Sequence, residues 1–124
     1  MVSIEPTGDQ LRQLRDLPYE GPIVMLNLLK FKPDGGAELY DQYSDVAGRL
    51  VIELGGRILY SGSQKMPFIG HEEWDTVLLI QYPSRDAFLA MTNDERYQAA
   101  VRYRHDSLID SRLYAMVTIP PPKR

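Results

Sequence analysis

Residues 21–32 form the stretch that most limits how this chain can fold. Their sequence, Gly-Pro-Ile-Val-Met-Leu-Asn-Leu-Leu-Lys-Phe-Lys, is an almost unbroken apolar run with one amide, Asn27, in its middle. Apolar side chains at both odd and even positions are typical of a β-strand that is buried on both faces. A buried amide costs about 1–3 kcal/mol unless its polar atoms are hydrogen bonded. We therefore expect Asn27 either to bond to the backbone of the core or to face a ligand pocket.

The remaining pattern predicts alternating strands and helices in a single domain over residues 1–124. Apolar residues recur every three or four positions over residues 38–54, which indicates a helix, and Gly55-Gly56 provides its end. The full set of expected elements is a short leading helix (7–17), strands at 23–32, 57–64, 74–82 and 111–119, a helix at 38–54, two helical segments within 84–108 of which the second is capped by Asn93, and a proline-rich tail at 120–124.

This order of elements predicts an α+β fold with one four-stranded antiparallel sheet over a core of about residues 22–119. Right-handed crossovers place both long helices on the same face of the sheet. Residues 23–31 and 77–82 are nevertheless apolar on both faces. A monomer would expose the second face as a large apolar patch, which soluble monomers rarely tolerate. We therefore expect a homodimer in which two sheets pack face to face.

Composition narrows the classes of function. The chain has 124 residues, a formal net charge of −3 and no cysteine. The charge argues against nucleic acid or an anionic membrane as the main partner. The lack of cysteine excludes disulfides, thiolate nucleophiles and zinc–cysteine sites. No apolar stretch approaches the ~20 residues of a membrane span, and the first residues show no secretory signal. The expected location is cytoplasmic.

Short motifs spread over residues 22–119 resemble those of one bacterial family. They are Asn27-Leu-Leu-Lys-Phe31, Tyr40 with Tyr43, Gly55-Gly56, Glu73-Trp-Asp75, Gln81-Tyr-Pro-Ser84, Ala87-Phe88 and Arg104. Together they resemble the family called domain of unknown function 1330 (DUF1330), in the dimeric α/β-barrel (ferredoxin-like) superfamily. The resemblance implies a βαββαβ fold in a small homodimer. Relatives include cofactor-free monooxygenases, polyketide cyclases, muconolactone isomerases, haem-degrading monooxygenases and non-catalytic ligand binders, so the fold selects no reaction.

We expect a pocket between the helices and the sheet. Its floor would include Asn27, its walls Tyr43, Trp74 and Phe88, and its charged member Arg104. Tyr43 lies in the apolar stripe of its helix, which favours core packing, although its hydroxyl could still reach into a cavity between helix and sheet. Such a lining suits a small, partly apolar ligand with an oxygen-bearing end.

The catalytic candidates are Asn27, Asp75 and Arg104. Arg104 stands at a stripe position that normally holds an apolar residue, so it either binds a carboxylate, of Asp75 or of a ligand, or extends to solvent. Asp75 could serve as a general base if an apolar site raised its pKa. Trp74 and Asp75 point to opposite faces of the expected strand, so at most one of them lines a given cavity.

Two kinds of function remain open. One is a cofactor-independent monooxygenase or isomerase, and the other is a non-catalytic ligand-binding or interaction protein. The two histidines, His71 and His105, lack metal-ligand spacing, so we expect no metal site. Neither kind of function requires a cofactor, and we expect none. A further alternative comes from the resemblance, because haem-degrading relatives use an asparagine, a tryptophan and a helical histidine. Asn27, Trp74 and His105 would be these residues, although His105 falls at the end of its helix.

Overall fold

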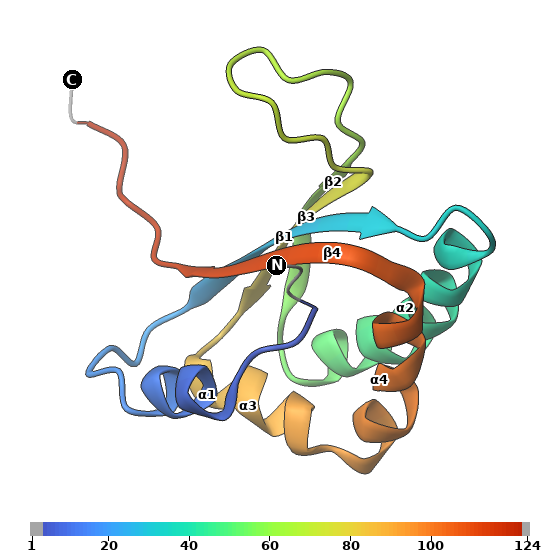
Figure 1. The fold of residues 1–124 in the computed structure, drawn as a ribbon. Coiled ribbons are helices and arrows are strands. Elements are labelled where there is room, and N and C mark those ends of the chain that lie inside the picture. Colours follow the sequence, from blue (N-terminus) through green and yellow to red (C-terminus); the bar gives the residue numbers. More distant parts are fainter. Residues whose placement is uncertain (1–3, 123–124) are drawn as a thin grey trace.

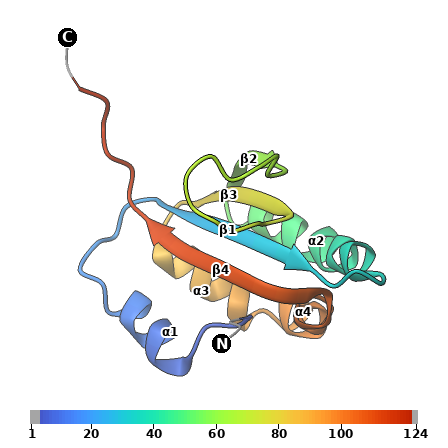
Figure 2. The same ribbon diagram turned by 45° about the horizontal axis from the view of Figure 1, so that its top comes forward.

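The computed structural model describes residues 4–122, which form one four-stranded sheet and four helices. The strands are all antiparallel, in the order β2–β3–β1–β4, and the helices lie on one face of the sheet (Figures 1 and 2). This confirms the predicted α+β arrangement. In chain order the elements are α1 (Gly8–Arg15), β1 (Ile23–Phe31), α2 (Gly36–Glu53), β2 (Arg57–Gly62), β3 (Thr76–Tyr82), α3 (Arg85–Asn93), α4 (Glu95–Ser107) and β4 (Leu108–Met116).

The central position of β1 explains its two apolar faces. The strand is paired with β3 on one side and with β4 on the other. Ile23, Met25 and Leu29 point toward the helical layer, where they belong to the buried core clusters that include residues of α2. The alternate residues, among them Leu26 and Leu28, point to the opposite face, which no helix covers. We call this second surface the open face of the sheet.

Several strand boundaries differ from the sequence prediction by one to three residues, among them the starts of two strands. β3 begins at Thr76 rather than at Trp74, and β4 begins at Leu108 rather than at residue 111. Leu108 directly follows the last residue of α4, Ser107, whose carbonyl accepts a hydrogen bond from the Lys32 N–H at 2.8 Å. This bond ties the junction to the end of β1. The apolar stripe of α4 predicted a helix that continues through Leu108. In the structure Leu108 instead pairs with Phe31 of β1 and begins β4.

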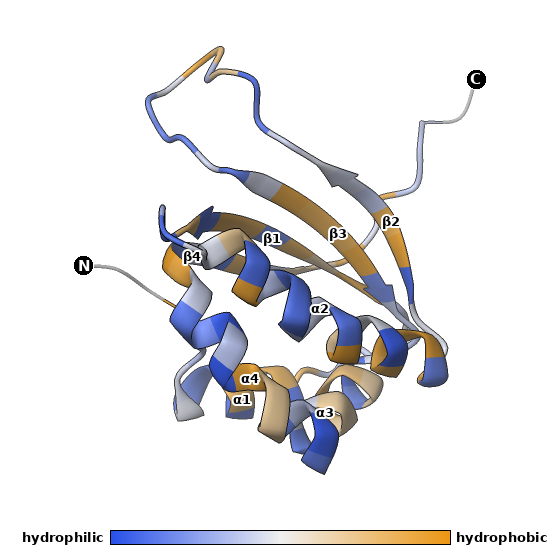
Figure 3. Cartoon of the chain, turned by 90° about the vertical axis from the view of Figure 1, so that its right-hand side faces the viewer, coloured by the Kyte–Doolittle hydropathy of each residue, from blue (hydrophilic) through white to orange (hydrophobic). Residues whose placement is uncertain are grey.

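The open face is largely hydrophobic. β3 contributes Val77 and Leu79, which pair with Leu28 and Leu26 of β1, and β4 contributes Tyr114, which is 50% exposed. Figure 3 shows hydrophobic colouring along the neighbouring strands β1 and β3. The loop between β2 and β3 and the segment after β4 both project on this side (Figure 1). None of the described helices is long and apolar enough to cross a bilayer.

Candidate functional site

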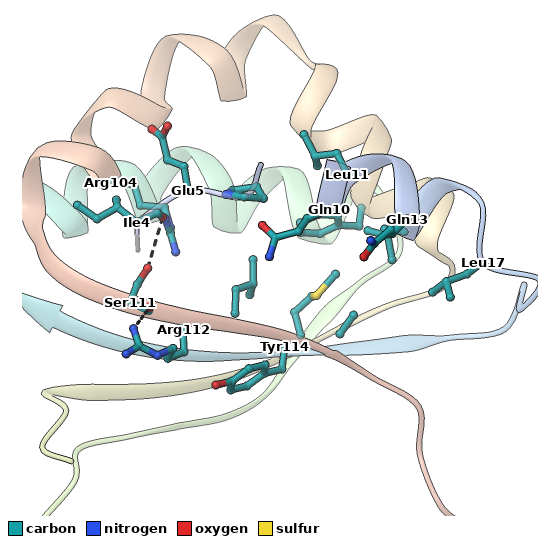
Figure 4. A pocket seen from close by; sticks show the side chains of 16 residues that line it. Ile4, Glu5, Gln10, Leu11, Gln13, Leu17, Arg104, Ser111, Arg112 and Tyr114 are labelled. Atoms are coloured by element: carbon teal, nitrogen blue, oxygen red, sulfur yellow. Dashed lines mark hydrogen bonds between the residues drawn. The ribbon is translucent and has the colours of Figure 1, made fainter. Parts of the chain in front are cut away.

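A pocket of about 490 Å³ lies between the N-terminal part of the chain and the edge of the sheet. One wall comes from α1, including Leu11 and Leu14, and the facing wall comes from β4, including Leu113 and Ala115. Residues 4–6, which we call the N-terminal strap, cross one end of it (Figure 4). We refer to this space as the α1–β4 pocket.

The local sequence explains how α1 comes to form this wall. The Thr7 hydroxyl accepts a hydrogen bond from the Gln10 N–H at 3.1 Å, while the Gln10 side-chain oxygen accepts from the Thr7 N–H at 2.9 Å. This reciprocal capping box fixes the start of the helix. The helix contacts α3, and Leu14 packs against the buried core cluster. The apolar side of α1 is therefore held over the edge of the sheet.

Arg104 is the buried charge of the α1–β4 pocket. It comes from the last turn of α4, lines the pocket and is only 6% exposed. Its Nη1 donates a hydrogen bond to the carbonyl oxygen of Ile4 in the strap. Within residues 4–122, no carboxylate forms a salt bridge with this guanidinium at 4.0 Å or less. The pairing of Arg104 with Asp75, one of the alternatives that the sequence left open, is therefore not formed.

Beside Arg104, the core contains a buried group of tyrosines. Burial raises the pKa of Tyr40 to about 12, and the nearby guanidinium of Arg104 acts in the opposite direction. Burial raises the pKa of Tyr43 well above its usual value, and the neighbouring tyrosines add to the effect. The Tyr43 hydroxyl donates to the Tyr97 hydroxyl at 3.2 Å. Tyr43 does not line the α1–β4 pocket, and its observed contacts are those of a core residue.

Asn27 lies on the helix side of β1, in register with Leu78 of β3 and Leu113 of β4. It is 7% exposed, and its Nδ2 donates to the Met25 carbonyl at 3.4 Å, which is near the upper limit for a hydrogen bond. The side chain is therefore on the helix face and not on the open face, but it does not line the α1–β4 pocket.

Phe88 is the second predicted site residue that lines this pocket. It is buried in α3, and its ring meets the ring of Tyr82 edge-on, with 5.1 Å between centroids. The structure thus brings Phe88 and Arg104 to one pocket and places Asn27, Tyr43 and Trp74 outside its lining.

Trp74 and Asp75 lie in the loop before β3, and their contacts are with the strands of the sheet and with this loop. Trp74 donates from its ring nitrogen to Glu72 at 3.1 Å, and the guanidinium of Arg112 lies 5.2 Å from the centre of its ring. Asp75 is exposed, and its carboxylate accepts a hydrogen bond from the Phe31 N–H at 2.8 Å. The Asp75 N–H in turn donates to the Leu29 carbonyl at 2.8 Å. These bonds extend the pairing of β1 and β3 beyond the strand ends.

The residues proposed for haem do not converge. His105 is exposed and its Nδ1 lies 3.2 Å from the carboxylate of its neighbour Asp106. Trp74 stacks with Arg112, which belongs to the open face, whereas Asn27 is on the helix face. We therefore derive no function through haem. Residues 4–122 contain no group of three or more histidine, aspartate or glutamate side chains placed to hold a metal ion.

Sequence reasoning did not find most of this pocket. Gln10, Gln13 and the strap come from the N-terminal segment, and Ser111 and Leu113 come from the strand at the far end of the chain. The apolar face of the leading helix, formed by Leu11 and Leu14, was the one signal available. A stripe of this kind shows that the helix is packed but does not identify the surface that it packs against.

Comparison with known proteins gives one family and a set of similar structures. Residues 35–116 match the model of the family described as "Domain of unknown function (DUF1330)". No curated protein matches the chain. The crystal structure of the RPA0582 protein of Rhodopseudomonas palustris, described as a protein of unknown function, is 36% identical, with a TM-score of 0.92. The alignment covers 98% of this chain and 100% of that one.

More distant structures share only the fold. A Caulobacter crescentus protein described as a "putative antibiotic biosynthesis monooxygenase" is 19% identical, with a TM-score of 0.65 over 82% of this chain and 93% of that one. A protein from Jannaschia sp. described as dimeric, ferredoxin-like and of unknown function is 15% identical, with a TM-score of 0.65. That alignment covers 79% of this chain and 100% of the other. The architecture is therefore ferredoxin-like.

Proposed function

Since the chain belongs to the DUF1330 family, whose description names no activity, we propose a function from the site itself: it binds a small, partly apolar, oxygen-bearing ligand in the α1–β4 pocket. The observation that carries this proposal is the buried guanidinium of Arg104 at one end of an otherwise largely apolar space. A ligand with an oxygen-bearing end would bind there, and its apolar body would lie along Leu11 and Leu113.

The size and lining of the pocket support this role. A volume of about 490 Å³ lies within the roughly 300–1,000 Å³ of typical small-molecule sites. Its walls combine leucine side chains with a few polar groups, among them Gln10 and Gln13 of α1. Apolar walls with a small number of polar groups are what such sites use to bind a ligand and to orient it.

The test is a thermal-shift screen of small organic compounds, followed by a variant that fills the pocket. Ala115 is exposed on β4 and lines the pocket, so Ala115→Trp should block it without removing a core contact. Ala90→Trp is the matched control, since Ala90 is exposed on α3 outside the pocket lining. Stabilising compounds should bind to Ala90→Trp and not to Ala115→Trp. Equal binding to both variants, or no stabilising compound at all, would contradict the proposal.

A second candidate is that the pocket also transforms its ligand, as a cofactor-independent monooxygenase or isomerase. This candidate rests on the fold shared with the Caulobacter protein described as a "putative antibiotic biosynthesis monooxygenase", and the fold by itself selects no reaction. Such an enzyme positions a substrate that is itself easily enolised. The check is to incubate wild type with a compound whose binding Ala115→Trp abolishes, and to follow oxygen uptake, the mass of the compound and its NMR spectrum, since isomerisation changes the spectrum but not the mass. An unchanged compound and no oxygen uptake would leave binding as the function.

We also propose that the chain forms a homodimer through the open face of the sheet. The support is the row of leucine and valine side chains on that face, including Leu26, Leu28, Val77 and Leu79, and the description of a structural neighbour as dimeric. Packing a second copy over this surface would remove its apolar side chains from water. Light scattering should give twice the subunit mass of 14.2 kDa, and a monodisperse monomer at micromolar concentration would contradict the proposal.

A further inference from the structure

Arg104 is a buried cation that the described protein leaves without a negative partner. The side chain is 6% exposed, and within residues 4–122 no aspartate or glutamate forms a salt bridge with it. The Ile4 carbonyl, to which it donates a hydrogen bond, and the nearby Tyr40 phenol are both neutral. Removing a charge from water is costly unless the charge is paired and hydrogen bonded. The site is therefore suited to an anion.

The other charges near the α1–β4 pocket do not fill this role. Among the residues that line it, Glu5 is the carboxylate, but its side chain is exposed and makes no salt bridge with Arg104. Arg112 also lines the pocket, and its Nη1 lies 2.8 Å from the carboxylate of Asp110. Arg112 is therefore already paired, which leaves Arg104 as the guanidinium that an incoming anion would neutralise.

The carbonyl of Ile4 is the acceptor that contacts the Arg104 guanidinium. It accepts hydrogen bonds from Arg104 Nη1 and, at 3.4 Å, from the Ser111 hydroxyl. Figure 4 shows Ile4, Arg104 and Ser111 together at one end of the pocket. Ile4 is anchored by its side chain, which packs against the core cluster that contains Leu29 and Tyr40. A neutral backbone carbonyl thus stands in contact with a full positive charge.

Resting on the proposed function, we propose that the ligand is an amphipathic monocarboxylate, with one carboxylate on an alkyl or aryl body, and that its carboxylate displaces the Ile4 carbonyl from Arg104. A carboxylate carries a full negative charge and two oxygens that match the guanidinium fork, whereas the carbonyl offers neither. The body of the ligand lies along the leucines of α1 and β4. The N-terminal strap is therefore a displaceable internal competitor, and ligand binding releases it.

The experiment compares 4-phenylbutyrate with the neutral 4-phenyl-1-butanol by isothermal titration calorimetry on the full chain. The two probes share their apolar body and differ at the end that meets Arg104. The acid should bind wild type about tenfold more tightly than the alcohol, since hydrogen bonds between two charged groups are stronger than neutral ones. In Arg104→Gln this preference should be lost. In Arg96→Gln, which removes a guanidinium of α4 that lies outside the pocket lining and is paired with Glu53 and Asp94, the preference should remain.

The strap is tested by Ile4→Ala, which keeps the carbonyl but removes the side chain that anchors it. This variant should bind the acid several-fold more tightly than wild type and the alcohol with little change, because the acid no longer competes with an anchored strap. It also leaves Arg104 in place, so the proposal stays testable if Arg104→Gln does not fold. An unchanged or weaker affinity of Ile4→Ala for the acid would overturn the strap as a competitor.

The outcomes separate this inference from the proposed function. Equal binding of acid and alcohol to wild type, lost for both in Ala115→Trp, would overturn the carboxylate assignment and leave the pocket as a binding site. Binding of either probe that persists in Ala115→Trp would overturn the inference because the site would lie elsewhere. If neither probe binds wild type, but another compound binds wild type and not Ala115→Trp, the monocarboxylate class is rejected and the pocket remains a binding site.

Discussion

At the scale of single residues, Asp75 shows how one side chain can have a structural role where sequence suggested catalysis. Its exposed carboxylate accepts the Phe31 N–H at 2.8 Å, which satisfies a backbone donor at the end of β1. Asp75→Ala should therefore lower the free energy of unfolding by about 1 kcal/mol, the usual net value of a hydrogen bond. Urea denaturation measures this loss.

The control for this position is Asp75→Asn, whose amide oxygen can still accept the Phe31 N–H and which should retain more of the stability than alanine does. Ligand binding in the α1–β4 pocket should be the same in both variants, since Asp75 does not line it. A loss of turnover in Asp75→Asn without a loss of stability would restore the general-base interpretation.

Tyr40 provides a residue-scale prediction about pH. Its pKa is raised from 10.0 to about 12, chiefly by burial, so the folded chain holds the phenol proton more tightly than the unfolded chain does. Below pH 10 the phenol is protonated in both states and its contribution to stability is complete. Between pH 10 and 12 the unfolded state loses the proton first, so stability falls as the pH rises.

The measurement is urea denaturation of wild type and Tyr40→Phe from pH 8 to pH 12, on a scale of about 1.4 kcal/mol per pKa unit. The variant should lose less stability than wild type over the window from 10 to 12. Tyr60→Phe, which removes a tyrosine that is 55% exposed on β2, serves as the control and should follow the wild-type curve. Parallel curves for wild type and Tyr40→Phe would show that the buried phenol does not titrate in this way.

At the scale of elements, α2 contains two glycines with opposite roles. A Cβ at Gly36 would lie 2.7 Å from the carbonyl oxygen of Ser107, at the junction of α4 and β4. A Cβ at Gly48 would meet no atom within 4 Å. The first glycine therefore permits close packing of the helix start against that junction, whereas the second leaves an interior helical position without a side chain.

The pair gives a matched prediction on one helix. Gly48→Ala should stabilise the protein by about 0.5–1 kcal/mol, because alanine loses less conformational freedom than glycine on folding. Gly36→Ala should destabilise it by about 1–3 kcal/mol, because the obstructing atom belongs to the backbone. Thermal or urea unfolding of both variants measures these changes in stability. A stabilised Gly36→Ala would mean that the α4–β4 junction moves easily.

At the scale of the whole molecule, the open face defines the expected assembly. Leu79 lies in β3 with strands on both sides, in register with Leu26 of β1 and Tyr60 of β2. Leu79→Glu should convert the dimer to a folded monomer, because a carboxylate in a sheet-on-sheet core would lose its hydration without a partner. Light scattering measures the mass and circular dichroism checks the fold.

The control for the assembly is Ile52→Glu. Ile52 is 65% exposed on α2, so the variant adds the same charge to the helical side of the molecule and should remain dimeric. A dimer that persists in Leu79→Glu, or that dissociates in Ile52→Glu, would place the interface away from the open face.

The sequence alone predicted most of the architecture because the signals of secondary structure are local. The two apolar faces of β1 and β3, together with the helical stripe of α2, led to the α+β fold and to an uncovered sheet face. Boundaries were less certain where two local patterns compete, as at Leu108, which fits both the stripe of α4 and the start of β4.

The site was only partly predictable. Arg104 and Phe88 could be selected from the sequence, since a charge in an apolar stripe and an aromatic on a covering helix are visible in one dimension. Trp74 and Asp75 were placed in a strand, but they precede it and hold the sheet together. The burial of Asn27 was predicted from the sequence. The face of the sheet on which it lies could be assigned only from the strand register, which pairs it with Leu78.

What the sequence by itself determined is the order of the elements, the strand that is apolar on both sides and the presence of an unusual arginine in α4. What only the tertiary structure decided is the location of the pocket. The contact between Arg104 and Ile4 joins residues that are 100 positions apart, and α1 faces β4 across the pocket only because α1 packs against α3. Periodicity reports which side of an element is buried, whereas packing decides what that side meets.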